Sequence, residues 1–118
     1  MHAYQSLFYQ GLDKYGPGKA GYTNMEFEAK LMQAIYCIES GIEYEAILNQ
    51  YFKGQDWTDF RNWVFYYLDN GVNSTFFEKY NYFIKIFNDK DLNYRGYISD
   101  SFPKMSVINF LLDGCPKL

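Results

Sequence analysis

Apolar residues recur every three to four positions along most of this chain, the spacing that places side chains on one face of an α-helix. Most of these stretches end at a glycine, as is common where a helix stops. The pattern predicts six helices, over residues 3–14, 24–40, 43–53, 57–70, 75–88 and 102–113. Every connection except residues 89–101 is short, which is typical of a compact helical bundle.

Strands are not predicted, although the aromatic and β-branched residues of this chain favour them. The apolar stripe expected over 57–70 consists of Phe60, Trp63, Val64, Tyr67 and Leu68, which follow a helical and not an alternating pattern. The sequence allows at most one short hairpin, near residues 94–98. The length of 118 residues suits one domain. We therefore predict an all-α fold, a single helical domain over 1–118 built as a compact bundle of five or six short helices.

The helix expected over 24–40 carries two apolar faces. Thr23 and Glu26 have capping-box spacing at its start. Such a helix either lies centrally between neighbours or keeps one face for a partner, and the pattern leaves both possibilities open. The first face comprises Phe27, Leu31, Ala34, Ile35 and Ile38, and the second comprises Met25, Ala29, Met32 and Tyr36.

Aromatic residues are abundant, whereas groups that carry out acid–base chemistry are scarce. The chain has 11 Phe, 13 Tyr and 2 Trp but a single His. Catalysis at neutral pH usually needs a poised His, Cys, Lys or carboxylate pair. The GPGKAG segment lacks the preceding strand and the following Ser or Thr of a phosphate-binding loop. We expect a binding protein without a cofactor and not an enzyme.

Cysteine usage and the N-terminal sequence both favour the cytoplasm. Cys37 and Cys115 lie far apart in a chain large enough for a core, so we interpret them as free thiols. Residues 1–15 lack the basic start and unbroken apolar run of a signal peptide. No apolar run is long enough to span a membrane, and we expect no membrane partner.

Acidic residues cluster in one part of a chain whose net charge is −3. Between residues 24 and 50, five Glu stand against Lys30 alone. An acidic surface repels phosphate backbones and attracts basic partners, so nucleic-acid binding is disfavoured and a basic protein is favoured. Tyr66 projects away from its helix's apolar stripe, as do Tyr82 and Ile86 on the next helix. The predicted partner-binding residues are Glu26, Glu28, Glu39, Glu43, Glu45, Asp56, Asp59 and Tyr66.

Residues 89–100, DKDLNYRGYISD, are similar to a calcium-binding EF-hand loop. Asp89, Asp91 and Asn93 occupy the first three ligand positions, and Asp100 stands at the closing carboxylate. The sixth position needs Gly for a sharp turn, and here it is Tyr94. We therefore expect no metal site, because Asp and Asn more often simply form turns.

The helical body from about Thr23 to Leu112 resembles the immunity proteins of contact-dependent growth-inhibition ribonuclease toxins. The resemblance is general, and it is carried by the Glu-rich segment and by the stretches WTDFRNWVFYYLDNG and FFEKYNYFIKIF. It implies a cytoplasmic protein that binds the nuclease domain of a cognate bacterial toxin and blocks its active-site cleft. Basic clefts of such toxins would attract an acidic partner.

Other functions remain open at this point. The same features suit a helical adaptor, or a phage-type inhibitor of another host protein. A degenerate EF-hand-like calcium binder is a further alternative, because of residues 89–100.

Overall fold

The computed structural model describes residue 15 and residues 18–41, 51–90, 96–109 and 111–112. Within these ranges it contains four helices and no strand: α3 (Tyr22–Glu39), α5 (Gln55–Asn70), α6 (Ser74–Lys90) and α7 (Ser106–Asn109). The all-α fold is thus confirmed for the described part of the chain. The predicted helix over 3–14 and most of that over 43–53 lie outside it. Residues 51–53 are described and are not helical, so the second of these helices does not reach residue 53.

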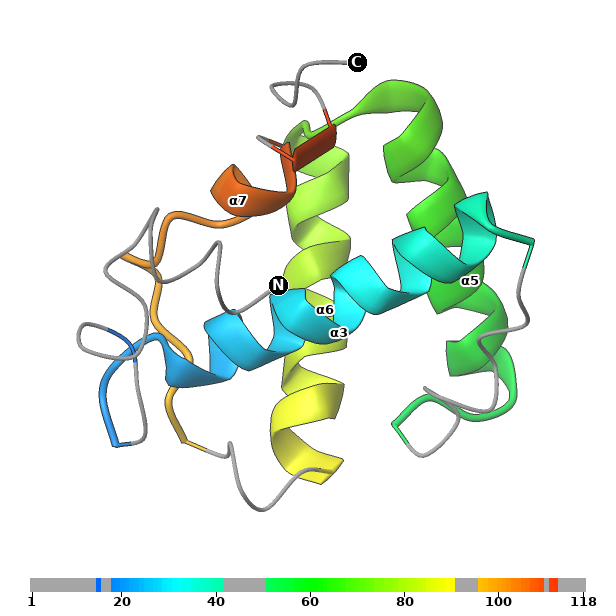
Figure 1. Cartoon of the computed structure of the whole chain (residues 1–118). Coiled ribbons are helices and arrows are strands. Elements are labelled where there is room, and N and C mark those ends of the chain that lie inside the picture. Colours follow the sequence, from blue (N-terminus) through cyan, green and yellow to red (C-terminus); the bar gives the residue numbers. More distant parts are fainter. Residues whose placement is uncertain (1–14, 16–17, 42–50, 91–95, 110, 113–118) are drawn as a thin grey trace.

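Helix α6 is the element against which the other long helices pack. It contacts both α3 and α5, and Figure 1 shows α3 crossing in front of it at a steep angle while α5 follows its side. Helices α5 and α6 are joined by only residues 71–73. Such a short connection makes them neighbours that run in opposite directions. Their outer faces therefore form one continuous surface.

The helix ends confirm two glycine stops and correct the capping box expected at Thr23. Gly41 and Gly71 both have φ of 71°, a conformation that favours glycine, directly beyond the ends of α3 and α5. Helix α3 has no side-chain cap, because its N-cap residue is Gly21; Thr23 lies inside the helix, where its Oγ1 accepts a hydrogen bond from the Tyr97 backbone N–H at 3.1 Å. At α6 the cap is Asn73, whose Oδ1 accepts from the Phe76 N–H at 2.8 Å.

The main core is a cluster of aromatic rings between α3, α5 and α6. Trp63 lies within it, stacked on Phe76 with ring centroids 4.6 Å apart and close to Phe83 at 5.1 Å. Its indole Nε1–H donates to the Phe76 carbonyl at 3.1 Å, so the buried polar atom has a partner. A second, smaller cluster contains Tyr15, Met25, Phe102 and Val107.

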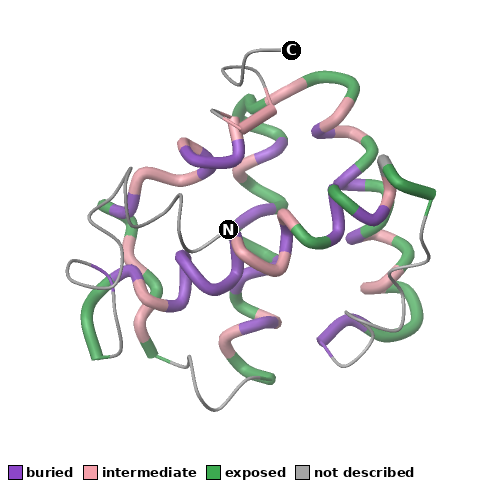
Figure 2. The backbone as a smooth tube through the Cα atoms, viewed as in Figure 1, coloured by how far each residue is buried: buried purple, intermediate pink, exposed green. Residues whose placement is uncertain are grey.

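The burial of the two apolar faces of α3 changes along the helix. Figure 2 shows the N-terminal half of α3 almost wholly buried. Met25, from the second face, is buried in the smaller cluster, whereas Tyr36 from that face is 62% exposed. The interpretation that this helix lies centrally between its neighbours is therefore correct for the first turns of α3, whereas in its last turns Tyr36 is exposed.

The predicted helix over 102–113 starts too early. Phe102 is buried in the smaller cluster and Met105 has a φ of 67°, which lies outside the right-handed helical region. Helix α7 therefore begins only at Ser106. It is tied to α5 by the Tyr67 hydroxyl, which donates to Asn109 Oδ1 at 2.6 Å. The hairpin allowed near 94–98 is not formed in its described residues, since 96–98 contain no strand.

Replacing Gly21 with Ala is expected to lower the free energy of unfolding by about 2–4 kcal/mol. Gly21 has a φ of 93°, and an added Cβ would lie 2.8 Å from Tyr15 Cδ1 and 3.1 Å from Phe102 Cδ2. The matched control is Gly41→Ala, where φ is 71° but no atom lies within 4 Å of the added Cβ. That control should lose only about 1 kcal/mol. Urea denaturation of both variants measures this, and equal losses would contradict the close packing at Gly21.

Candidate functional site

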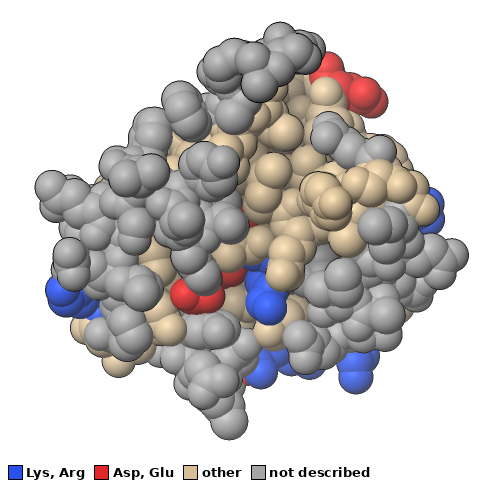
Figure 3. Space-filling view, viewed as in Figure 1, with Lys and Arg blue, Asp and Glu red and all other residues tan. Residues whose placement is uncertain are grey.

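Two of the predicted partner-binding glutamates are not on the surface. Glu28 is completely buried and Glu26 is 7% exposed, so the prediction that they form an exposed acidic face is wrong. The physical reason is that residues 96–105 lie against α3, as their hydrogen bonds to Thr23, Asn24 and Glu28 show. The Glu39 side chain, Glu43 and Glu45 lie outside the described residues. Figure 3 shows described acidic and basic side chains scattered over the α3 face, without a continuous acidic patch among them.

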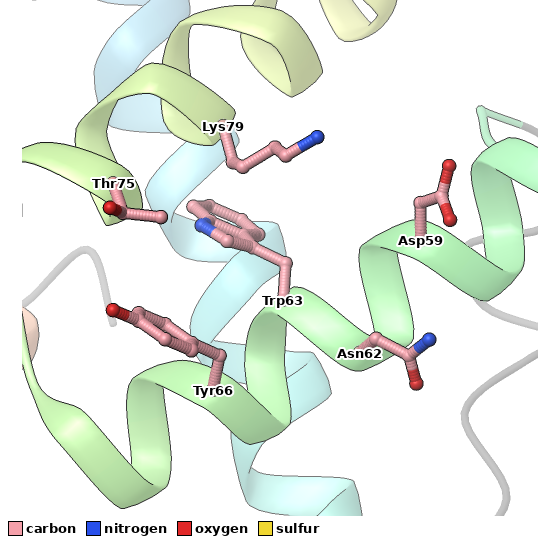
Figure 4. A pocket seen from close by; sticks show the side chains of 6 residues that line it. All are labelled: Asp59, Asn62, Trp63, Tyr66, Thr75 and Lys79. Atoms are coloured by element: carbon pink, nitrogen blue, oxygen red, sulfur yellow. The ribbon is translucent and has the colours of Figure 1, made fainter.

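The remaining predicted residues, Asp56, Asp59 and Tyr66, all lie on α5. Asp59 and Tyr66 line a groove between α5 and α6 with a volume of about 270 Å³. Figure 4 shows the groove with α3 behind the two helices. The lining residues are Asp59, Asn62, Trp63, Tyr66, Thr75 and Lys79.

Trp63 forms the floor of this groove, and polar side chains form its rim. In Figure 4 Tyr66 and Thr75 lie at one end, Asp59 and Asn62 at the other, and Lys79 extends from α6 between them. Because Trp63 is 4% exposed and hydrogen-bonded to the Phe76 carbonyl, the floor belongs to the rigid core. The groove can therefore offer an apolar surface that is already in place, together with charged and hydroxyl groups at its edge.

Hydrogen bonds hold the rim residues in position. Asn73 Nδ2 donates to the Tyr66 hydroxyl oxygen at 2.7 Å, and Gln55 Nε2 donates to Asp59 Oδ1 at 2.8 Å. The Tyr82 hydroxyl donates to Asp56 Oδ1 at 2.7 Å, which links α6 to the first turn of α5. These residues and the groove together form the surface that we call the α5–α6 face.

Electrostatics on the α5–α6 face reflect its two aspartates. The hydrogen bond to Asp56 is the largest of the effects that raise the pKa of the Tyr82 phenol, followed by desolvation and the charges of Asp56 and Asp59. Tyr82 therefore keeps its proton and remains a donor to Asp56. Lys79 Nζ lies 5.9 Å from the centre of the Tyr82 ring, close enough for a cation–π contact.

Part of the α5–α6 face could be predicted from the sequence. Tyr66 and Tyr82 lie off the apolar stripes, so helical periodicity predicts that they project from α5 and α6. Thr75 and Lys79 were not predicted, although the same helical periodicity puts them on the exposed side of α6. What brings them beside Asp59 is the short 71–73 connection, which could have been used to pair the two outer faces.

A second polar cluster is buried where α3 meets α6 and residues 96–105. Glu28 Oε2 accepts hydrogen bonds from the Tyr80 hydroxyl at 2.6 Å and from the Met105 N–H at 2.9 Å. Burial, the dominant effect, raises the pKa of Glu28 to about 7, and the two hydrogen bonds and the Lys104 charge act in the opposite direction. The prediction that the α3 glutamates are exposed to solvent is therefore wrong for Glu28, which is more deeply buried than Glu26.

Metal ligands do not gather in the described part of the chain. No group of three or more His, Cys, Asp or Glu side chains there could hold a metal ion. Of the EF-hand-like segment, Asp91, Asn93 and Tyr94 lie outside the described residues. Cys37 is a buried free thiol. None of the described helices is both long and apolar enough to cross a membrane.

No family model, curated protein or solved structure matches this chain. Conclusions about its function therefore depend on the chemistry of its own surfaces, above all the α5–α6 face and the Glu28 cluster.

Proposed function

We propose that this protein is an immunity protein that binds a cognate bacterial nuclease toxin, through the α5–α6 face, and blocks the toxin's active-site cleft. The observation that carries the proposal is the grouping of Asp56, Asp59, Tyr66 and Tyr82 around a groove floored by Trp63. This surface replaces the one expected from residues 26–45, because Glu26 and Glu28 are buried. The toxin acts on nucleic acid inside the cell, so the proposed location is the cytoplasm.

Charge supports a basic partner. Asp56 and Asp59 are partly exposed on the same side of α5, and Lys79 is the cation that lines the adjoining groove. A nuclease that binds nucleic acid has a basic cleft, and carboxylates on a partner complement it as phosphates do. Complementary charges of this kind mainly accelerate association.

Aromatic side chains on the α5–α6 face add binding energy to that of the charges. Tyr82 is 47% exposed, and Tyr66 is partly exposed at the end of the groove. Tyrosine and tryptophan are the residues that most often anchor protein interfaces. Because Tyr66 and Tyr82 are already held by Asn73 and Asp56, little side-chain freedom would be lost on binding.

The double charge reversal Asp56→Lys with Asp59→Lys is expected to slow association with the toxin's nuclease domain about 10- to 100-fold at low salt. It should also make association less sensitive to ionic strength, because the attraction that salt screens is removed. Stopped-flow or surface-plasmon-resonance kinetics with the product of the adjacent gene, tested as the toxin, measure both effects.

The control is Asp100→Lys, which reverses one charge at an exposed position of the 96–105 segment. Figure 1 places that segment on the opposite side of the molecule from α5. Its association rate should stay within about twofold of the wild type, since a distant exposed charge is largely screened. Equal slowing by Asp100→Lys and by the α5 pair would indicate a general charge effect and remove the case for the α5–α6 face.

A further inference from the structure

Residues 96–105 are held against α3 by a row of hydrogen bonds that ends at Glu28. The Tyr97 carbonyl accepts from the Gly21 N–H at 2.8 Å, and the Tyr97 N–H donates to Thr23 Oγ1 at 3.1 Å. The Ser99 N–H donates to Asn24 Oδ1 at 2.8 Å. The last bond is that from the Met105 N–H to Glu28 Oε2, at 2.9 Å.

Met105 is held in an unfavourable backbone conformation at this last bond. Its φ of 67° is in the left-handed region that residues with a Cβ rarely adopt, and among the described residues it is the non-glycine residue with this geometry. The Met105 side chain is fully buried in the main core. The hydrogen bond to Glu28 therefore helps to maintain a conformation that the chain would otherwise leave.

The Glu28 carboxyl is only half satisfied in this position. Oε2 accepts both of the available hydrogen bonds, from Tyr80 on α6 and from Met105, whereas Oε1 is buried and has no hydrogen-bond partner. A negative charge there would face two neutral donors, with Lys104 as the cation that acts on it from the 96–105 segment. An ionised carboxylate is costly to bury unless all its acceptor sites are satisfied.

Protonation of the Glu28 carboxyl removes this cost of burial. A neutral carboxyl buries no charge and still accepts both hydrogen bonds on Oε2. If residues 96–105 move away, water reaches the carboxyl and its pKa returns towards the ordinary value of 4.5 from about 7. The closed arrangement therefore binds the proton more tightly than the open one, and loss of the proton favours opening.

We propose that Glu28, Tyr80 and Met105 form a proton-controlled latch, which holds residues 96–105 on α3 and α6 while Glu28 is protonated and loosens them when it ionises. Opening would separate Phe102 from Tyr15 and Met25 and uncover the smaller apolar cluster. The latch is independent of the α5–α6 face. It makes exposure of an apolar surface depend on pH near neutrality.

Amide hydrogen exchange of the wild-type protein between pH 5 and pH 8 tests the latch, after correction for the intrinsic pH dependence of exchange. Protection of the Tyr97, Ser99 and Met105 amides should fall on the order of 100-fold over this range. These amides should also exchange faster than amides in the middle of α5 at pH 8, because the segment opens without unfolding the protein. In Glu28→Gln the fall in protection should disappear, since the amide side chain does not titrate.

Two results would overturn the latch. One is protection at Tyr97, Ser99 and Met105 that does not change with pH in the wild type. The other is exchange of these amides at the same rate as the α5 amides at every pH, which would mean that Glu28 becomes accessible only when the whole protein unfolds. If Glu28→Gln fails to fold, Tyr80→Phe is the second variant. It removes a donor to Oε2, so the pH-dependent loss of protection should extend to higher pH.

Discussion

Replacing Glu28 with Gln is expected to raise the free energy of unfolding at pH 8 by roughly 2–3 kcal/mol. The folded-state pKa of Glu28, about 7, lies above its ordinary value of 4.5. A raised pKa contributes stability that is fully present below pH 4.5 and is lost as pH rises towards 7. Gln resembles the neutral carboxyl and can still accept from Tyr80 and Met105, so the variant avoids this loss.

Urea denaturation of the wild type and of Glu28→Gln at pH 5 and pH 8 measures this effect. The difference between the two proteins should be largest at pH 8 and shrink below about 1 kcal/mol at pH 5. Comparing the two proteins cancels the titration of all other carboxyls. A variant that is no more stable than the wild type at pH 8 would contradict the burial of a titrating carboxyl.

Replacing Trp63 with Ala is expected to lower the free energy of unfolding by about 3–5 kcal/mol. The ring packs against Phe76, Phe83 and Phe60, and its Nε1–H bond to the Phe76 carbonyl would also be lost. Such a loss is a large part of the stability of a domain of this size.

Trp57→Ala is the matched control for the Trp63 variant. Trp57 is only partly buried and stacks on Phe60 from the edge of the core, at 6.3 Å between centroids. The control should lose about half as much stability or less, because less surface returns to water. Thermal melting of the two variants, monitored by circular dichroism, compares their losses of stability. An equal loss in both variants would show that Trp63 is not at the centre of the core.

The two helices that form the candidate site could be predicted closely from the sequence. The predicted ranges 57–70 and 75–88 match α5 (Gln55–Asn70) and α6 (Ser74–Lys90) to within two residues. The stripe over 57–70 is set by local periodicity, and residues that it places inside, such as Trp63 and Tyr67, are indeed buried. Off-stripe Tyr66 and Tyr82 could be found by the same reasoning.

The Glu28 cluster could not be predicted, because it depends on contacts between distant parts of the chain. Residues 96–105 reach α3 from more than 70 positions away in sequence, as the Ser99–Asn24 and Met105–Glu28 bonds show. Periodicity places a Glu on a helix face but does not say whether another segment covers it. The left-handed Met105 is equally invisible in sequence, since such a conformation normally signals Gly.

The central claim is that this protein neutralises a nuclease toxin through its α5–α6 face, and growth rescue tests it most directly. Cells that produce the product of the gene adjacent to this protein's gene, tested as the toxin, should survive when the wild type or Asp100→Lys is co-expressed. They should die, or grow far more slowly, with Asp56→Lys and Asp59→Lys combined, provided that circular dichroism shows this variant folded. Absence of rescue by the wild type would refute the immunity function, and full rescue by the α5 double variant would refute the proposed interface.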